Sequence, residues 1–201
     1  MELTGTSATK NPLGLNISGL FVAIFGGSRT HLKFENISKQ LGQALYSQKY
    51  NIIYGGGSGG PMAAAPLELS RLGGQTIGVL PKYWEHDCGE TPGHLILVDN
   101  LAERKKYFFD YSCAFVGLPG GFGTLDEILE YVTYRQMQVH SKPIILLNVD
   151  GFYDCFKEWI NRAVMEGCIS QNCQSILQIV DSIDDVISIL DSQRQELGYS
   201  Y

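Results

Sequence analysis

Apolar runs of strand length alternate along this chain with longer segments in which apolar residues recur every three or four positions. Short continuous apolar runs are typical of buried parallel strands, and the three- to four-residue spacing is typical of helices that cover a sheet. The predicted strands span residues 20–25, 52–54, 76–80, 95–98, 114–118 and 144–148, with a short seventh near 176–180. The predicted helices span 31–49, 61–72, 101–111, 124–139 and 152–167, with a last one near 183–190. The alternation predicts an α/β fold, a Rossmann-like, doubly wound parallel sheet of six to seven strands with helices on both faces.

The length of 201 residues fits one such domain and is short for two independent cores. We expect a single nucleotide-binding domain over residues 20–191, a flexible arm over 1–19 and a polar tail over 192–201. The arm has one lysine and no continuous apolar core, so it resembles neither a secretory signal nor a transit peptide. No window is long and apolar enough to span a bilayer, and we expect no membrane partner.

Charge and cysteine usage narrow the class of partner. A net charge of −6 argues against a nucleic-acid polymer, which needs a basic face, whereas a small phosphorylated ligand needs only local positive potential. Five cysteines without a CxxC pair suit free thiols in a reducing compartment, so we expect a cytoplasmic protein. The four histidines show no metal-ligand spacing, and we predict no metal.

Three glycine-rich loops follow predicted strands: GGS at 26–28, GGGSGG at 55–60 and PGGFGT at 119–124. In open parallel sheets ligands bind outside the carboxyl ends of the strands, so the three loops are expected to converge on one site. Glycines let an anion approach the main chain, and the first N–H groups of the helix expected to open at Thr124 favour a phosphate. The candidate phosphate- and nucleotide-binding residues in these loops are Gly27, Ser28, Gly55, Gly56, Gly57, Ser58, Pro119, Gly120, Gly121, Gly123 and Thr124.

Neither common nucleotide fingerprint is present. The first loop lacks GxGxxG with an acidic residue about 20 positions later, and no GxxxxGK[ST] occurs, so the pattern favours neither NAD or FAD binding nor ATP hydrolysis. A nucleotide or sugar phosphate remains the expected ligand.

Glu127 has two interpretations. Thr124 to Glu127 reads as a T-x-x-E capping box, in which the glutamate only bonds the amide at its own helix start. Alternatively, the carboxylate beside the phosphate cradle contacts the ribose and activates water, or stabilises positive charge at the anomeric carbon. The sequence pattern alone does not decide between these two interpretations of Glu127.

Arg104, Lys105 and Lys106 lie early in the helix after the fourth strand, again on the carboxyl-end side of the sheet. Such a charge run is usually a solvated helix face. The position of Arg104 favours a second interpretation, since a guanidinium offers a planar fork of donors to a phosphate or a polarised base.

GGGSGGPM, ERK and PGGFGTLDE, in that order on one doubly wound sheet, closely resemble the Lonely Guy (LOG) family of cytokinin-activating phosphoribohydrolases over residues 20–190. The resemblance implies hydrolysis of an N6-modified adenosine 5'-monophosphate to free base and ribose 5-phosphate, without cofactor, in a homodimer that completes the pocket. The family's catalytic glutamate and arginine correspond to Glu127 and Arg104, and Lys105 completes its arginine–lysine pair.

The sequence also departs from the family pattern. FGGSR replaces FCGSS, and GGGSGGPMA replaces GGGSxGLMG, with Pro66 expected to bend or delay the helix and to reshape the base pocket. Relatives long carried the label lysine decarboxylase, but no lysine here is placed for pyridoxal phosphate chemistry. Two alternatives stay open on fold grounds: a molybdenum-cofactor carrier that does not hydrolyse its ligand, and a broader nucleoside monophosphate nucleosidase.

Overall fold

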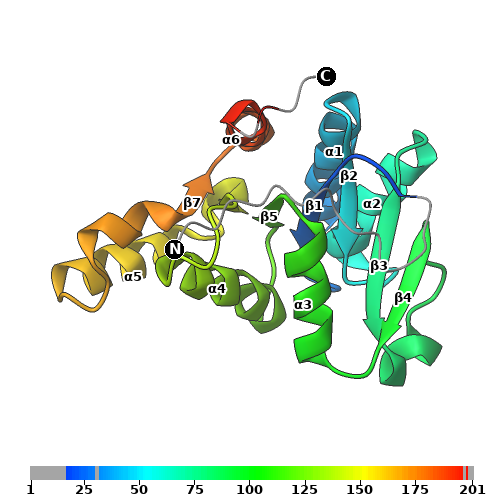
Figure 1. Ribbon diagram of the computed structural model, residues 1–201, viewed down its shortest axis with the longest axis horizontal. Coiled ribbons are helices and arrows are strands. Elements are labelled where there is room, and N and C mark those ends of the chain that lie inside the picture. The colour runs from blue at the N-terminus through cyan, green and yellow to red at the C-terminus, as the bar shows by residue number, and fades with distance from the viewer. Residues whose placement is uncertain (1–16, 30–31, 197, 199–201) are drawn as a thin grey trace.

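The computed structural model describes residues 17–29, 32–196 and 198, and its centre is a sheet of seven parallel strands (Figure 1). The strands are β1 Leu20–Phe25, β2 Tyr50–Tyr54, β3 Thr76–Pro81, β4 His94–Val98, β5 Ala114–Gly117, β6 Ile144–Leu147 and β7 Leu177–Val180, in the spatial order β4-β3-β2-β1-β5-β6-β7. The chain builds outward from β1 to β4, then crosses back to add β5, β6 and β7. Strand order therefore reverses between β1 and β5, which is where such sheets bind ligands.

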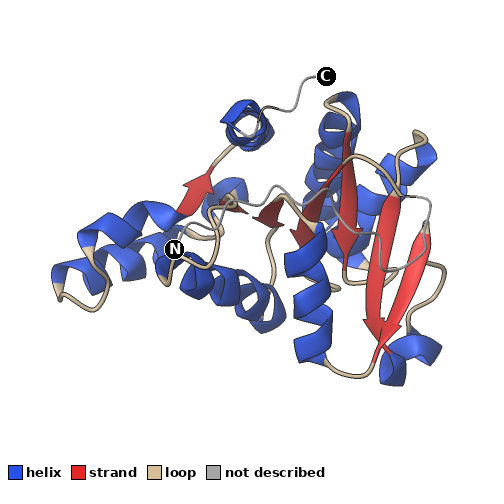
Figure 2. Ribbon diagram, in the orientation of Figure 1, coloured by secondary structure: helices blue, strands red, loops and turns tan. Residues whose placement is uncertain are grey.

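Helices cover both faces of the sheet, as Figure 2 shows. They are α1 Leu32–Ser47, α2 Gly60–Arg71, α3 Leu101–Tyr111, α4 Phe122–Gln136, α5 Asp154–Met165 and α6 Ile183–Glu196, with short 3-10 helices η1 Lys82–Asp87, η2 Val149–Gly151 and η3 Gln171–Ile176. Residues of β1 alternate between two cores: Val22 and Ile24 pack toward α1, α2 and α6, and Phe21 and Phe25 pack toward α3 and α4. The predicted doubly wound α/β fold is confirmed.

Helix α2 runs through Pro66 without a delayed start, so that part of the expectation is wrong. A side chain of α1 supports this turn of α2: the buried Ser38 hydroxyl donates to Pro61 O at 2.5 Å and accepts from Ala65 N at 3.0 Å. These two groups would bond each other in a regular helix, and the inserted hydroxyl satisfies both. Pro61 itself lies in the first turn, where its missing N–H costs nothing.

Ser38→Ala is expected to lower the free energy of unfolding by about 1–3 kcal/mol, because it strands a buried donor and a buried acceptor at once. Urea unfolding measures the change. Ser47→Ala, which removes an exposed hydroxyl from the same helix, is the matched control and should cost far less. Equal costs for the two variants would show that the bridge does not stabilise α2.

The end of the chain differs from the prediction, because α6 continues to Glu196. Arg194 explains the extension: Nη2 donates to Gln48 O at 2.8 Å, and the guanidinium lies 4.0 Å from the ring centroid of Tyr50. Residues 192–196 are thus helix rather than tail. Most of the expected arm, residues 1–16, and the predicted helix start at His31 lie outside the described residues. Within the part described, no helix is long and apolar enough to cross a membrane.

Candidate active site

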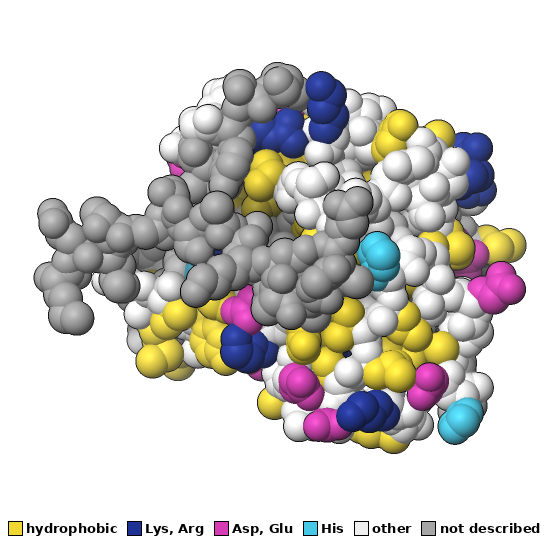
Figure 3. All heavy atoms as spheres, turned by 45° about the vertical axis from the view of Figure 1, so that its right-hand side comes forward, with side chains coloured by type: hydrophobic (Ala, Val, Ile, Leu, Met, Phe, Trp, Pro, Cys, Tyr) yellow, Lys and Arg dark blue, Asp and Glu magenta, His cyan; other side chains and the backbone are white. Residues whose placement is uncertain are grey.

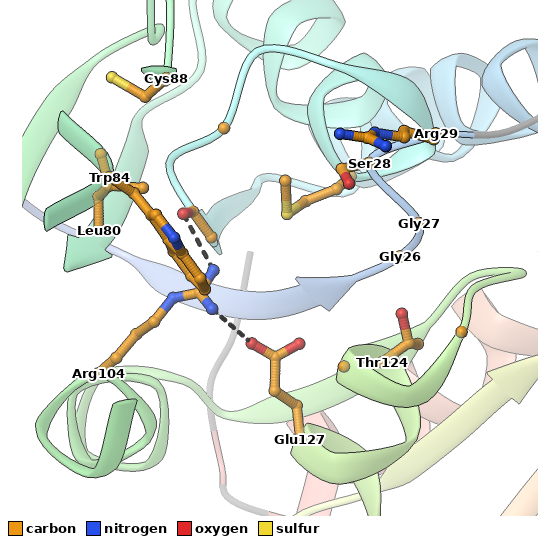
Figure 4. A pocket seen from close by; sticks show the side chains of 15 residues that line it. Gly26, Gly27, Ser28, Arg29, Leu80, Trp84, Cys88, Arg104, Thr124 and Glu127 are labelled. Carbon is orange, nitrogen blue, oxygen red and sulfur yellow. Dashed lines mark hydrogen bonds and ion pairs between the residues drawn. The ribbon is translucent and has the colours of Figure 1, made fainter. Parts of the chain in front are cut away.

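A pocket of about 640 Å³ opens at the carboxyl edge of the sheet, where strand order reverses (Figure 4). Loops after β1, β2, β3 and β5 and the helices α2, α3 and α4 contribute to its wall. It is lined by Gly26, Gly27, Ser28, Arg29, Gly55, Gly57, Met62, Leu80, Trp84, Cys88, Arg104, Gly121, Gly123, Thr124 and Glu127. The three glycine loops therefore converge on one site, as predicted.

Backbone contacts fix the loops against one another. Gly27 N donates to Pro119 O at 3.2 Å, and Met62 N donates to Gly27 O at 3.4 Å, so the β1 loop is tied to the loop after β5 and to the first turn of α2. Gly60 has φ +65°, and a Cβ there would lie 2.4 Å from Gly27 O. Only glycine fits that junction without displacing the β1 loop.

The start of α4 presents unpaired donors to the pocket. The helix begins at Phe122 with Gly121 as N-cap, and no side chain caps it. The first intrahelical bond runs from Leu125 N to Gly121 O at 3.2 Å, so the N–H groups of residues 122–124 precede the helical hydrogen-bond pattern. Both Gly121 and Gly123 face open space in the pocket. This arrangement favours an anion.

The capping-box interpretation of Glu127 is wrong. Thr124 is the third residue of α4, not its N-cap, and it is buried. The carboxylate of Glu127 lies 3.2 Å from Arg104 Nη1 instead. A side-chain N-cap bond does occur at α3, where Asn100 accepts from Glu103 N at 2.9 Å, while Glu103 accepts from Asp99 N at 2.8 Å.

Arg104 is held rigidly in the wall. It is buried, and its Nε donates to Val79 O at 2.9 Å while Nη2 donates to Gly55 O at 3.0 Å. A Cβ on Gly55 would lie 2.1 Å from Nη2, so the guanidinium needs glycine there. The carbonyl groups of Val79 and Gly55 thus hold the guanidinium so that its remaining nitrogen, Nη1, faces Glu127 (Figure 4).

Burial sets the protonation of Glu127. Desolvation raises the pKa of its carboxyl to about 7, although the Arg104 guanidinium acts in the opposite direction. Removal from water disfavours the charged form more strongly than the ion pair restores it. A carboxyl that titrates near neutral pH inside a pocket has the acidity that a general acid or base requires.

Other predicted residues lie outside the pocket wall. Lys105, 16% exposed in its side chain, pairs with Asp126 at 3.3 Å and with Glu130. These pairs join α3 to α4, and Lys105 is not among the lining residues of the pocket. Gly56, Ser58, Pro119 and Gly120 belong to the converging loops but are not among the lining residues.

The sequence interpretation missed the wall formed by Met62, Leu80, Trp84 and Cys88. Trp84 lies in η1, directly after β3, and its ring centroid is 6.0 Å from the Arg104 guanidinium carbon. A signal was available, because PKYWEHD also follows a predicted strand at the carboxyl edge. This segment lacks the glycines that mark the other three loops, so the glycine pattern did not identify it as part of the site.

Comparison with known proteins agrees with the fold and the loops. The family model described as "Possible lysine decarboxylase" matches residues 62–190. The chain is 34% identical over 195 residues to the cytokinin riboside 5'-monophosphate phosphoribohydrolase LOG3 of Arabidopsis thaliana, covering 95% of this chain and 88% of that protein. It is 38% identical over 160 residues to the enzyme LOG of Oryza sativa subsp. japonica, covering 78% and 66% of the two chains.

Solved structures with the same fold include the molybdenum cofactor binding protein of Rippkaea orientalis, with a TM-score of 0.68, 21% identity and coverage of 88% of this chain and 98% of that one. DNA processing protein A of Helicobacter pylori has a TM-score of 0.55 at 17% identity, covering 86% and 80%. At such identities the structures show the fold alone. The sequence relatives decide the family: the chain belongs to the LOG family, whose curated members named here are phosphoribohydrolases.

Proposed function

We propose that the protein hydrolyses the N-glycosidic bond of a nucleoside 5'-monophosphate and releases free base and ribose 5-phosphate. The proposed substrate is an N6-modified adenosine 5'-monophosphate. The observation that carries the proposal is the buried Glu127 carboxyl, paired with Arg104 at 3.2 Å, one turn along α4 from uncapped N–H groups. A helix start that favours an anion and a carboxyl with a pKa raised to about 7 thus face one pocket, which supports both parts of the proposal.

In this proposal the 5'-phosphate lies against the N–H groups of residues 122–124. Ser28 and Arg29 line the same end of the pocket and supply a hydroxyl and a positive charge. The helix dipole and charge-assisted hydrogen bonds both favour the phosphate there. Glu127 is then placed beside the ribose.

The reaction breaks the bond between C1' and the base nitrogen, and the bonding electrons leave with the base. Positive charge develops at C1' in an oxocarbenium-like transition state, which the ionised Glu127 stabilises. A water attacks C1' and gives its proton to Glu127. The departing base takes up a proton from solvent, since Glu127 is the one carboxylate among the described lining residues.

Arg104 acts in the proposal by orienting Glu127 and by opposing the rise of its pKa. Two of its N–H groups are already committed to Val79 O and Gly55 O. It thus keeps a useful share of the carboxyl ionised near neutral pH, in surroundings that otherwise favour the acid.

The runner-up is a nucleotide or molybdenum-cofactor carrier, which the structural neighbours suggest. A carrier needs the glycine loops but has no use for a buried carboxyl that titrates near pH 7. No lysine is among the described lining residues, so the decarboxylase description of the family model has no support in this pocket. Figure 3 shows acidic and basic side chains mixed on the face that it presents, unlike the basic face that DNA binding requires.

The proposal is tested by incubating the protein with AMP and with N6-isopentenyl-AMP and identifying the products by mass spectrometry. We expect free base and ribose 5-phosphate in equal amounts, with the N6-substituted substrate preferred. A panel of other nucleoside monophosphates separates this from a broader nucleosidase. Tight binding of the nucleotides without any product, or co-purified pterin, would favour the carrier.

The acid limb of the pH profile is a second expected result. Only the ionised Glu127 accepts the proton, so kcat/KM should fall as pH drops through about 7, and by about tenfold per unit well below it. Initial rates between pH 5 and 9 measure this. A profile that is flat from pH 5 to 7 would contradict the assignment of Glu127 as the base.

We further propose a homodimer through the exposed face of α4, in a cytoplasmic protein. Phe122, Leu129 and the C-cap residue Met137 are spaced seven and eight residues apart and are 94%, 37% and 70% exposed, so large apolar groups follow the length of α4. Light scattering should give a mass near 44 kDa, twice the 22.2 kDa chain, and Leu129→Arg should shift it toward one chain. A parent protein with the mass of one chain would contradict the dimer.

A further inference from the structure

The residues of the pocket lie in a definite order. Figure 4 shows Thr124, Gly27 and Ser28 toward one end, the Arg104–Glu127 pair in the middle, and Trp84, Leu80 and Cys88 toward the other end. The first end carries the uncapped helix start, and the middle carries the acid–base group. A nucleotide has the same order of parts: phosphate, ribose and base.

We propose that Trp84 is the platform on which the planar base of the substrate stacks, and that it is a residue determining substrate specificity in this chain. The inference rests on the proposed function and extends it to the base end. It assigns a substrate class, an aromatic heterocycle carrying apolar substituents, to the end of the pocket that Trp84, Leu80 and Cys88 line.

The indole is fixed and yet available. Its neighbour Tyr83 contacts it edge-on, with ring centroids 5.1 Å apart and planes at 71°. The Arg104 guanidinium carbon lies 6.0 Å from its centroid, which sets the ring next to the reacting pair. Trp84 is nevertheless 42% exposed, so a large part of this apolar ring in the pocket wall stays open. Large amphipathic rings so placed are typical of ligand contacts.

Stacking suits this end chemically. Every nucleobase has a π-face, and stacking on an aromatic side chain contributes substantially to its binding without reading its hydrogen-bond edge. Leu80 adds apolar surface at the same end (Figure 4), which an alkyl group on the base could cover. Polar recognition is concentrated at the other end, where the phosphate is proposed to lie.

A second role for Trp84 has to be separated from stacking. Its ring could merely support the Arg104 guanidinium, in which case replacing it would disturb the reacting pair for any ligand. Stacking instead affects only ligands that contain a base. Ribose 5-phosphate, which has the phosphate and sugar but no base, therefore distinguishes the two roles.

The first test compares Trp84→Leu with the parent. We expect KM for AMP to rise about 10- to 100-fold, with the inhibition constant of ribose 5-phosphate and the pH at half-maximal kcat/KM unchanged. Trp84→Phe should recover most of the loss, because it restores an aromatic face. Equal weakening of AMP and ribose 5-phosphate, or a shifted pH profile, would overturn the inference in favour of support for Arg104.

The second test needs no turnover. The chain has two tryptophans, and Trp159 lies on α5, so Trp159→Phe leaves Trp84 as the single indole. Glu127→Gln in the same protein slows hydrolysis enough for binding to be measured, and equilibrium dialysis checks that each ligand binds. AMP should quench the emission, and ribose 5-phosphate should not. AMP that binds without quenching overturns the inference alone, whereas an absence of AMP binding and hydrolysis in the parent overturns the proposed function as well.

Discussion

Replacing Glu127 with glutamine is expected to lower kcat for AMP hydrolysis by about 10²- to 10⁴-fold, the usual contribution of a positioned acid–base group. Glutamine keeps the size of the side chain and can still accept a hydrogen bond from Arg104, but it cannot take a proton or balance positive charge at C1'. Nucleotide binding should change much less, because the phosphate is proposed to lie on the start of α4. Single-turnover rates and equilibrium dialysis measure the two effects.

Asp126→Asn is the matched control, since it removes a neighbouring carboxylate that is 59% exposed and pairs with Lys105 rather than Arg104. It should retain most of the parent's turnover.

The pH dependence of the melting temperature provides an independent check on Glu127. Burial raises the pKa of Glu127 in the folded protein, so the parent should lose stability relative to Glu127→Gln as pH rises from about 4.5 to 7. Full turnover by a folded Glu127→Gln variant would remove the catalytic assignment.

Replacing Arg104 with methionine is expected to lower the free energy of unfolding by about 3–5 kcal/mol at pH 8, because it leaves the Glu127 carboxylate buried without its partner. It also leaves Val79 O and Gly55 O without a donor. The pKa of Glu127 should rise further, so the loss should be smaller at pH 6, where the carboxyl is protonated. Urea unfolding at the two pH values measures it.

The double variant Arg104→Met/Glu127→Gln completes a double-mutant cycle of unfolding free energies for this ion pair. Once the carboxylate is absent, losing the guanidinium should cost less, and the two changes should be clearly non-additive. Additive losses at pH 8 would show that the pair at 3.2 Å contributes nothing to stability. In that case the burial of Arg104 would reflect only its carbonyl contacts.

The fold was predictable because both of its signals are local. Continuous runs such as the one in β6 Ile144–Leu147, buried along its whole length, are characteristic of parallel strands. Glycine loops at strand ends then place the pocket, because parallel strands bring their carboxyl ends to one edge. Helix ends were less predictable: Arg194 extends α6 by bonding Gln48 O, a contact between residues 146 positions apart.

The residues of the site were more predictable than the contacts that they make. Thr124 and Glu127 have the spacing of a capping box, but α4 starts earlier and Arg104, from another helix, takes the carboxylate. Lys105 follows Arg104 in sequence, yet helical geometry turns it about 100° away, toward Asp126 and Glu130. These outcomes depend on how α3 and α4 pack, which no local pattern contains.

The most direct test is a crystal structure of the Glu127→Gln protein with AMP. The account predicts that the 5'-phosphate accepts hydrogen bonds from the N–H groups at the start of α4, with the side chain at position 127 beside C1' and the adenine toward Trp84. A phosphate bound away from that helix start, or a side chain at 127 directed away from the ribose, would contradict it.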